Sequence, residues 1–191
     1  MTELLPLNNA QLPVKLRLDD YLSLDAAGAF QDYRKTELID GEIYFMNAQH
    51  RPHARIKSRL FLLIAAALDQ LDIGLEAIVE ASMAIPPHSS PEPDIVVTSE
   101  PEGAGLIPLA SAKLIVEVSD ATLAFDTTRK AALYARAGVP EYWIVDVDAG
   151  VIRQLWSPAG DYYAERRDAA FGERVEAATI DGLAVDTTAL G

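Results

Sequence analysis

Two carboxylates in the middle of the chain are placed where they could share a metal ion. Asp94 directly precedes an apolar run, residues 95–98, and Glu117 interrupts a second apolar run, residues 114–118. An ionised carboxylate inside such a run is costly unless it meets a cation or a metal. Carboxylates at neighbouring strand ends suit Mg²⁺, which prefers oxygen ligands and keeps several waters. A metal there would lower the pKa of a bound water and stabilise charge on a phosphoryl oxygen, so the pair predicts phosphoryl chemistry.

Lys130 is the third member of this constellation. It lies on an expected helix of residues 127–137, for which Asp126 is the expected N-cap and Gly138 the expected C-cap. At about 100° per residue, Lys130 falls on the same apolar stripe as Tyr134, so it points toward the sheet. A lysine near a metal can orient a water or hold developing negative charge. A lysine whose stem packs while its ammonium reaches water would give the same pattern.

Strands and helices are expected to alternate around these residues. The expected strands cover residues 36–47 as a hairpin, 78–85, 95–98, 114–118, 141–146, 151–156 and 161–166, with weaker signals around 174–175 and 180. A short helix is expected within residues 18–30, and longer helices are expected over residues 52–71 and 127–137. Asp40-Gly41 suits the positive backbone angles of a tight hairpin turn, and residues 157–160 are the expected turn of the later antiparallel pair. The three candidate residues thus belong to two neighbouring strands and the helix that follows them.

The helix of residues 52–71 carries two polar features. Arg51, Arg55 and Arg59 recur every four residues and form a basic ridge, which could contact phosphates or simply face solvent. His53 shares the apolar stripe of the same helix. A histidine in that position is either a satisfied core residue or, because it sits in the first turn, a residue that reaches a site.

Length and charge limit the possible partners. The 191 residues suffice for one domain with a core, which we expect over residues 18–191 after a loosely held arm of residues 1–17. The net charge is −13. Domains that bind nucleic acid through their overall field are normally basic, so any phosphate contact here requires a local patch or a bound cation. Acidity that merely keeps the protein soluble is the alternative.

Cysteine usage and the N-terminus limit the class further. The chain has no cysteine, which excludes a disulfide framework, a thiolate nucleophile and a cysteine metal site. No apolar run approaches the length of a membrane span, and the N-terminus lacks the basic start and apolar core of a signal peptide. A cytoplasmic protein without a membrane segment is the simplest expectation.

Several motifs together resemble a known family. They are TELIDGEI at residues 36–43, His53 opening a helix, Pro93-Asp94, IVEVSD at residues 115–120, the helix with Lys130 and Tyr134, and AGVPEYWIVD at residues 137–146. In these motifs the chain resembles the Uma-type group of restriction-endonuclease-like proteins, within the PD-(D/E)xK nuclease superfamily, over roughly residues 33–163. The resemblance implies an α/β fold with a mixed central sheet flanked by helices, preceded by an N-terminal hairpin and followed by an antiparallel extension.

The resemblance also implies roles for individual residues. The implied metal ligands are Asp94, Glu117 and the backbone carbonyl of Val118. Lys130 matches the catalytic lysine. Glu37 matches an acidic residue contributed earlier in the chain, and His53 matches the recurrent histidine of the first long helix.

One position departs from the superfamily pattern. The usual lysine two residues after the second acid is replaced by Ser119. Lys130 can serve instead if its ammonium reaches the same point in space. Lys113 is the rival, since residues 113, 115 and 117 point to one face of the strand, but it lies about 13 Å along the strand from Glu117.

Three functions remain open at this point. The first is a Mg²⁺-dependent endonuclease, with Mn²⁺ as substitute, that hydrolyses DNA phosphodiester bonds with water and without a covalent intermediate. In it, Lys130→Ala or Asp94→Asn would abolish cleavage and leave folding intact. The second is a catalytically silent nuclease-fold module that binds a protein partner. The third is a metal phosphohydrolase acting on small nucleotides. A homodimer is expected for the nuclease, because two sites related by a two-fold axis cut a duplex most simply.

Overall fold

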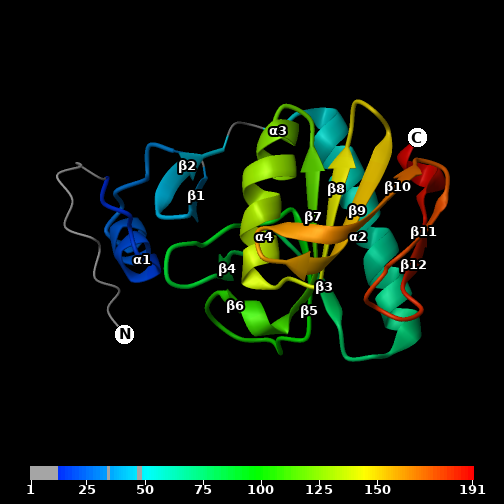
Figure 1. The fold of residues 1–191 in the computed structure, drawn as a ribbon, viewed down its shortest axis with the longest axis horizontal. Helices are drawn as coiled ribbons and strands as arrows, with labels where there is room; N and C mark the ends of the chain where they lie inside the picture. Colours follow the sequence, from blue (N-terminus) through cyan, green and yellow to red (C-terminus); the bar gives the residue numbers. More distant parts are fainter. Residues whose placement is uncertain (1–12, 34, 47–48) are drawn as a thin grey trace.

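A mixed six-stranded sheet forms the centre of the molecule (Figure 1). The computed structural model describes residues 13–33, 35–46 and 49–191. The strands, in spatial order, are β10 (Tyr162–Ala170), β9 (Val151–Ala159), β8 (Glu141–Asp146), β7 (Ala112–Ser119), β5 (Ile95–Thr98) and β3 (Glu76–Val79). β7 and β8 are parallel, and every other neighbouring pair in this sheet is antiparallel. The expected α/β class with a mixed central sheet is therefore confirmed.

The long helix α2 (Arg51–Leu71) covers one face of the sheet. Its buried apolar residues recur every four residues, which is the stripe of an amphipathic helix. They are Ile56, Leu60, Ile64 and Leu68. This stripe packs against alternate residues of the sheet, among them Leu114, Val116 and Val118 of β7. Because successive side chains of a strand point to opposite faces, Glu117 must point to the other face.

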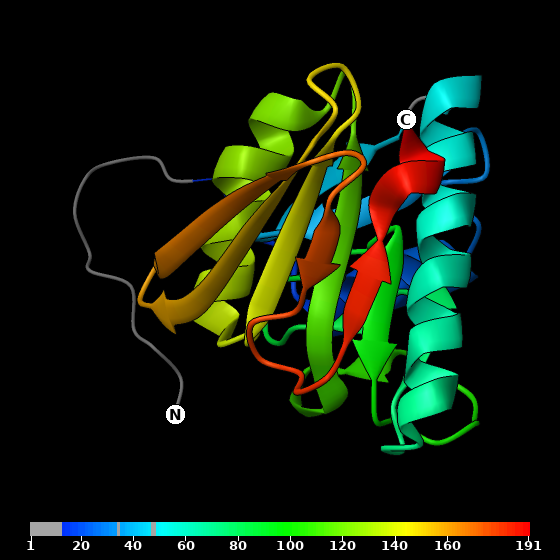
Figure 2. The same cartoon turned by 90° about the vertical axis from the view of Figure 1, so that its right-hand side faces the viewer.

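That other face is covered by a helical segment built from three pieces, as Figure 2 shows with the sheet between it and α2. The pieces are α3 (Leu123–Phe125), a π-helical turn η2 (Asp126–Lys130) and α4 (Ala131–Ala137). Asp126 was expected to cap this helix, and that expectation is wrong because the helix begins one turn earlier. The Asp126 carboxylate instead accepts hydrogen bonds from the hydroxyls of Ser119 at 2.7 Å and Thr122 at 2.6 Å. Gly138 ends the segment with a φ of +78°, as expected of a C-cap.

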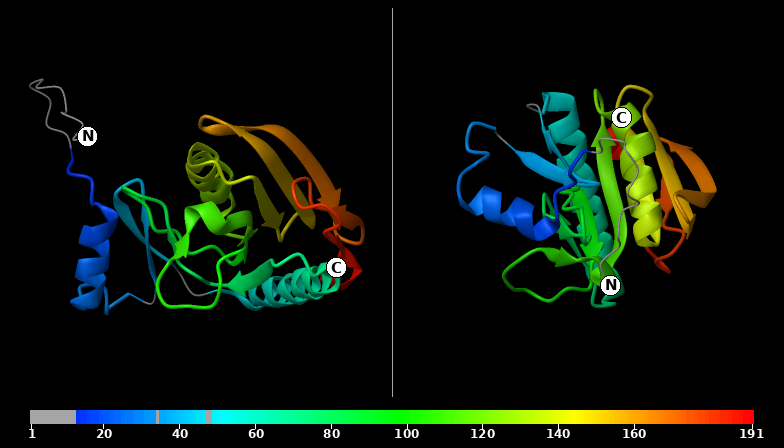
Figure 3. Two further views of the ribbon diagram at one scale, coloured as in Figure 1. Left: turned by 90° about the horizontal axis from the view of Figure 1, so that it is seen from below. Right: turned by 60° about the vertical axis from the view of Figure 1, so that its left-hand side comes forward.

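Helix α1 (Leu18–Ala26) and the hairpin of β1 (Thr36–Ile39) and β2 (Glu42–Phe45) lie at one end of the molecule, away from β10 and the C-terminus (Figure 3). The hairpin turns at Asp40-Gly41 with φ values of 50° and 77°, so the predicted tight turn is confirmed. Helix α1 is the short helix expected within residues 18–30. Of the expected arm, residues 1–12 lie outside the described residues, and the amide of Leu16 donates to the Gly41 carbonyl at 3.1 Å. The predicted last hairpin residue, Asn47, also lies outside the described residues.

The strand expected over residues 78–85 is broken in two. β3 ends at Val79, and Glu80 takes a left-handed φ of 52°, which turns the chain out of the sheet. The chain resumes as β4 (Met83–Ala84), which pairs in parallel with β6 (Ile107–Pro108). The segment of residues 99–111 after β5 contains β6 and a 3-10 turn, η1 (Leu109–Ser111).

The C-terminal part closes the far end of the core. The β9–β10 pair is longer than expected and turns at residues 160–161 rather than over 157–160. The later strands are β11 (Arg174–Glu176) and β12 (Ala184–Asp186), followed by η3 (Thr187–Leu190). The strand signal at Ile180 is wrong, because this residue is buried in the connecting loop. None of the helices in the described ranges is both long and apolar enough to cross a membrane.

Candidate active site

The site is built where the start of β5 meets the end of β7. These two strands are antiparallel, so Asp94, just before β5, lies beside the last residues of β7. The carboxylate of Asp94 accepts a hydrogen bond from the amide of Val118 at 2.9 Å. Asp94 was expected from sequence to lie beside the end of the neighbouring strand. It does, and its side chain contacts the backbone of that strand.

The backbone carbonyl of Val118 also faces this corner. In an antiparallel pair, the amide and carbonyl of one residue point to the same neighbouring strand. Since Val116 pairs with Ile95, continuing that register would place Val118 opposite Pro93. Proline has no amide hydrogen to donate, so the Val118 carbonyl receives no ladder hydrogen bond from Pro93. A buried carbonyl without a ladder partner is a ready ligand for a cation.

Helix α2 brings two basic side chains to Asp94. His53 Nε2 lies 3.3 Å from Asp94 Oδ2, and Lys57 Nζ lies 3.4 Å from Asp94 Oδ1. Gln49, just before the helix, donates to Asp94 Oδ1 at 3.4 Å. Burial alone would raise the pKa of Asp94, but the interactions with His53, the Val118 amide and Lys57 outweigh burial and lower that pKa. Asp94 is therefore held ionised.

Lys130 forms ion pairs with Glu117 and Glu37 on the face of the sheet that α2 does not cover. Its ammonium lies 2.9 Å from Glu117 Oε1 and 3.1 Å from both oxygens of Glu37. Tyr134, one helical turn later, donates its hydroxyl to the same Glu117 oxygen at 3.0 Å. The predicted stripe of Lys130 and Tyr134 is thus confirmed, and the lysine does not extend to solvent, because only 1% of its surface is exposed.

Burial and neighbouring charges shift the pKa values of Glu117 and Lys130 in opposite directions. Burial raises the pKa of Glu117, and the ammonium of Lys130 only partly offsets that rise. Burial alone would lower the pKa of Lys130, but Glu117 and Glu37 outweigh it and hold that pKa above its usual range. Among the described residues, no side chain or amide donates to Glu117 Oε2. Additional positive charge beside Glu117 would therefore favour its ionised form.

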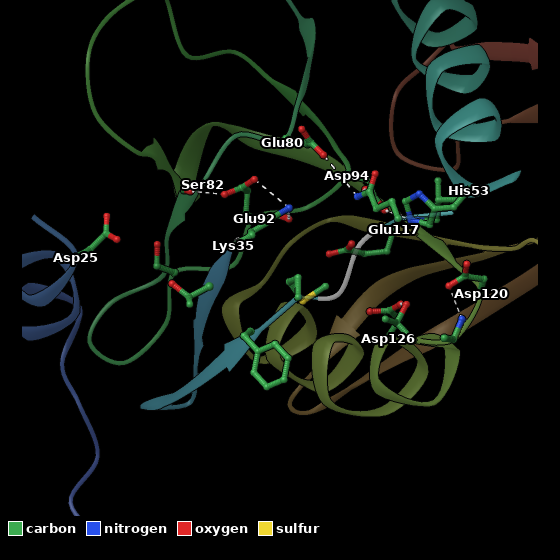
Figure 4. Close-up of a pocket in the computed structure, with 18 of the residues that line it drawn as sticks. Asp25, Lys35, His53, Glu80, Ser82, Glu92, Asp94, Glu117, Asp120 and Asp126 are labelled. Carbon is green, nitrogen blue, oxygen red and sulfur yellow. Dashed lines mark hydrogen bonds and ion pairs between the residues drawn. The ribbon is translucent and has the colours of Figure 1, made fainter. Parts of the chain in front are cut away.

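A cavity of about 900 Å³ opens beside these groups. Asp94, Glu117, Val118 and His53 line it, and Figure 4 shows the first two with His53 on one side of it. The remaining lining is rich in acids and contains Lys35 and His50 as further basic side chains. The other acidic residues in the lining are Asp25, Glu80, Glu92, Asp120 and Asp126.

Two of the predicted catalytic residues, Lys130 and Glu37, do not line this cavity. Lys130 and Glu37 lie behind Glu117, in the buried layer between the sheet, α4 and the hairpin. Glu37 also accepts a hydrogen bond from the amide of Glu92 at 2.7 Å, which ties the hairpin to the chain segment before Asp94. In this structure, Lys130 reaches the cavity only through Glu117.

The basic ridge and the rival lysine lie elsewhere. Arg51 and Arg55 are exposed near the start of α2, whereas Arg59 donates to the carbonyl of Ala189 in η3. None of these three arginines lines the cavity. Lys113 donates to the Ala110 carbonyl at 3.3 Å, near the opposite end of β7 from Val118, so it is not a substitute for Lys130.

Three residues near the site were missed from sequence. Lys57 lies four positions after His53, and helical spacing alone places both on one face, so its signal was available. Gln49 and Lys35 lie outside regular elements and carried no periodic signal. Lys35 Nζ pairs with Glu92 Oε1 at 2.9 Å inside the cavity.

The chemistry of the donor set fits a hard divalent cation. Two carboxylates and one carbonyl are oxygen ligands, and Mg²⁺ needs only one or two protein carboxylates because it keeps several waters. Across the described ranges, no three histidine or acidic side chains converge into a ready metal cluster. A cation held by Asp94, Glu117 and the Val118 carbonyl would thus complete its shell with water.

A mixed sheet flanked by helices, with acidic residues at adjacent strand ends, defines a nuclease-like fold. The chain belongs to the Uma2 family, described as "Putative restriction endonuclease", whose sequence pattern matches residues 18–188. Its fold is similar to that of a crystal structure described as a putative nuclease of DUF820 from Anabaena variabilis. That similarity has a TM-score of 0.69 at 19% sequence identity, and covers 92% of this chain and 97% of the other. A comparison with curated proteins gave no match.

Proposed function

We propose that this protein is a metal-dependent endonuclease that hydrolyses DNA phosphodiester bonds with water as the nucleophile. One observation carries the proposal: Asp94, Glu117 and Val118 line one open cavity, and the Asp94 carboxylate accepts a hydrogen bond from the Val118 amide at 2.9 Å. Membership of the Uma2 family, described as "Putative restriction endonuclease", supports it. Mg²⁺ is the proposed cofactor, with Mn²⁺ as its substitute, since the ligands are all oxygens.

The residues around the proposed metal ligands have distinct tasks. When bound, a divalent cation lowers the pKa of a water and stabilises charge on a phosphoryl oxygen. His53 and the Val118 amide fix the orientation of Asp94 and keep it ionised. Tyr134 holds one oxygen of Glu117, which leaves the other oxygen free to face the cavity.

We assign Lys130 a positioning role rather than direct contact with substrate. Its ammonium touches Glu117 and Glu37 and is almost completely buried. In that position it stabilises the ionised form of Glu117 and fixes the distance between β7 and the hairpin. Contrary to the expectation from sequence, Lys130→Ala should destabilise the fold, because that change leaves two buried carboxylates without their cation.

A Mn²⁺ titration tests the proposal. Heat of binding and nicking of a supercoiled plasmid are measured for the wild type, for Asp94→Asn and for Glu76→Gln as a matched control. Glu76 is an exposed acid on β3 at the edge of the sheet. We expect binding and nicking in the wild type and the control, and neither in Asp94→Asn. Undiminished nicking in Asp94→Asn would refute the assignment of the metal site.

The acidic cavity lining favours a second candidate, a catalytically silent module that binds a basic segment of a protein partner. Acidic side chains outnumber basic ones around the cavity, which opposes entry of a polyanion unless cations are bound. This candidate predicts neither nicking nor Asp94-dependent Mn²⁺ binding in the same titration. Turnover of free nucleotides without cleavage of DNA would instead indicate a small-molecule phosphohydrolase. Sedimentation would test the homodimer, which we propose only for cutting both strands of a duplex.

A further inference from the structure

An aromatic side chain stands exposed among the residues that line the cavity. Phe45, the last residue of β2, lines the cavity with 60% of its surface exposed. Tyr33 supports it, with the two ring centroids 5.6 Å apart and the rings tilted by 35°. An exposed phenyl ring in a water-filled cavity loses the hydrophobic stabilisation that burial would give. A flat apolar ligand that stacked on the Phe45 ring would bury it and regain that stabilisation.

The same cavity offers one lysine for an anion. Among the described residues that line the cavity, Lys35 is the one lysine, and its ammonium lies 2.9 Å from Glu92 Oε1. Thr36, which follows Lys35 directly, pairs with Phe45 across the hairpin. The aromatic ring and the cation therefore come from adjacent positions of one hairpin, while the proposed metal ligands come from the sheet.

The acidic lining limits how much polyanion the cavity accepts. A duplex places charge on both strands and is normally bound by a broad basic surface. Single strands are bound differently, because unpaired bases stack on aromatic side chains and add affinity that does not depend on charge. A cavity with one exposed aromatic ring, one lysine and many acids suits a single unpaired nucleotide far better than a duplex.

We propose that the cavity binds an unpaired nucleotide of single-stranded DNA, with its base stacked on Phe45 and its phosphate directed to the metal ligands past Lys35. The inference rests on the proposed nuclease function and names its substrate class. Described residues of a single chain line the cavity and carry the proposed metal ligands, so we expect cleavage of an unpaired strand without a second copy. Any nicking of a supercoiled plasmid would then occur at transiently unpaired segments.

The test compares a short labelled single strand, the same strand in a blunt duplex, and the same strand with abasic sites. Binding is followed by fluorescence anisotropy on Asp94→Asn protein, which keeps the strand intact, and cleavage is followed on otherwise wild-type protein with Mn²⁺. The variants are Phe45→Leu and, as a matched control, Tyr162→Leu. Tyr162 has a similar exposed fraction, 61%, but lies on β10 and does not line the cavity.

We expect the single strand to bind and react better than the duplex. Phe45→Leu should weaken single-strand binding about tenfold, which is the size of one lost base–aromatic stack. It should leave binding of the abasic strand unchanged, and Tyr162→Leu should change neither. Both substitutions replace exposed side chains, so we expect unchanged thermal melting.

Failure of this inference is distinguishable from failure of the proposed function. Cleavage of duplex and single strand at equal rates, with no effect of Phe45→Leu, would overturn the stacking site and leave the nuclease in place. Base-dependent binding that is lost in Phe45→Leu, without any cleavage by the wild type, would support the stacking site and refute the nuclease. If Phe45→Leu changes binding of a basic peptide but of no oligonucleotide, the ring serves a protein partner and the inference is wrong.

Discussion

Asp94 Oδ2 accepts a hydrogen bond from the backbone amide of Val118, with a donor–acceptor distance of 2.9 Å. One proposed metal ligand thus orients the backbone of another. This bond occupies the position where the β5–β7 ladder would otherwise continue through Pro93. Pro93 cannot donate a hydrogen bond, and the side chain of Asp94 takes over the Val118 amide while the Val118 carbonyl is left available. Pro93 therefore ends the hydrogen-bond ladder between β5 and β7, and Asp94 places its carboxylate at the same position.

Substitution of Asp94 should separate its structural role from its role at the site. Asp94→Ala leaves the Val118 amide without an acceptor and should lower the free energy of unfolding by about 2 kcal/mol. Asp94→Asn retains an acceptor oxygen, so its loss should be roughly half as large. Urea denaturation of both variants measures the difference. Equal losses would show that the hydrogen bond to Val118 contributes nothing to stability.

Removal of Lys130 should destabilise the fold strongly. Lys130→Met leaves the buried carboxylates of Glu37 and Glu117 without their cation, and breaking a buried pair in this way costs about 3–5 kcal/mol. Lys113→Met, at a partly exposed lysine on β7, is the matched control and should stay within about 0.5 kcal/mol of the wild type. Chemical denaturation provides the measurement, and a small loss in Lys130→Met would contradict the ion-pair cluster.

Lys57 should compete with a divalent cation for Asp94. Its ammonium is 3.4 Å from Asp94 Oδ1 and 2.6 Å from Glu80 Oε1, so it places positive charge beside the proposed metal. Lys57→Met should therefore raise Mn²⁺ affinity by about tenfold in calorimetry at low salt, since the repulsion between the two cations is removed. Lys57→Arg keeps the charge and should show no such gain. Weaker Mn²⁺ binding in Lys57→Met would mean that the lysine supports the site instead.

The basic ridge on α2 should contribute to nucleic-acid binding through two of its three arginines. Arg51 and Arg55 are exposed, and each phosphate contact to a single strand contributes about 0.7 to the slope of log affinity against log salt. The double variant Arg51→Ala/Arg55→Ala should reduce that slope by about 1.4. Arg59→Ala should leave the slope unchanged and lower stability, because Arg59 is bonded to the Ala189 carbonyl. A slope unaffected by the double variant would show that the ridge faces solvent only.

Local sequence determined the elements and much of the hairpin geometry. The apolar runs of β5, β7 and β8, the Asp40-Gly41 turn and the Gly138 cap are each specified within a few residues, and each is found as predicted. The errors occurred where local signals compete. Residues 78–85 have strand propensity throughout, but Glu80 adopts a left-handed conformation and divides them. Asp126 is a residue type that favours the N-cap, yet it lies within the helical segment. There its carboxylate accepts hydrogen bonds from the hydroxyls of Ser119 and Thr122.

Only the tertiary structure decided how the candidate residues divide between the cavity and the core. Sequence placed Glu117 and Lys130 on facing elements, but it could not show that Lys130 is enclosed by Glu117, Glu37 and Tyr134. Enclosure depends on the hairpin and α4, whose packing is set by contacts between residues far apart in the chain. The same long-range packing brings Phe45 and Lys35 to the cavity. Periodicity reports which face of an element is buried, whereas the partner on that face is chosen by the fold as a whole.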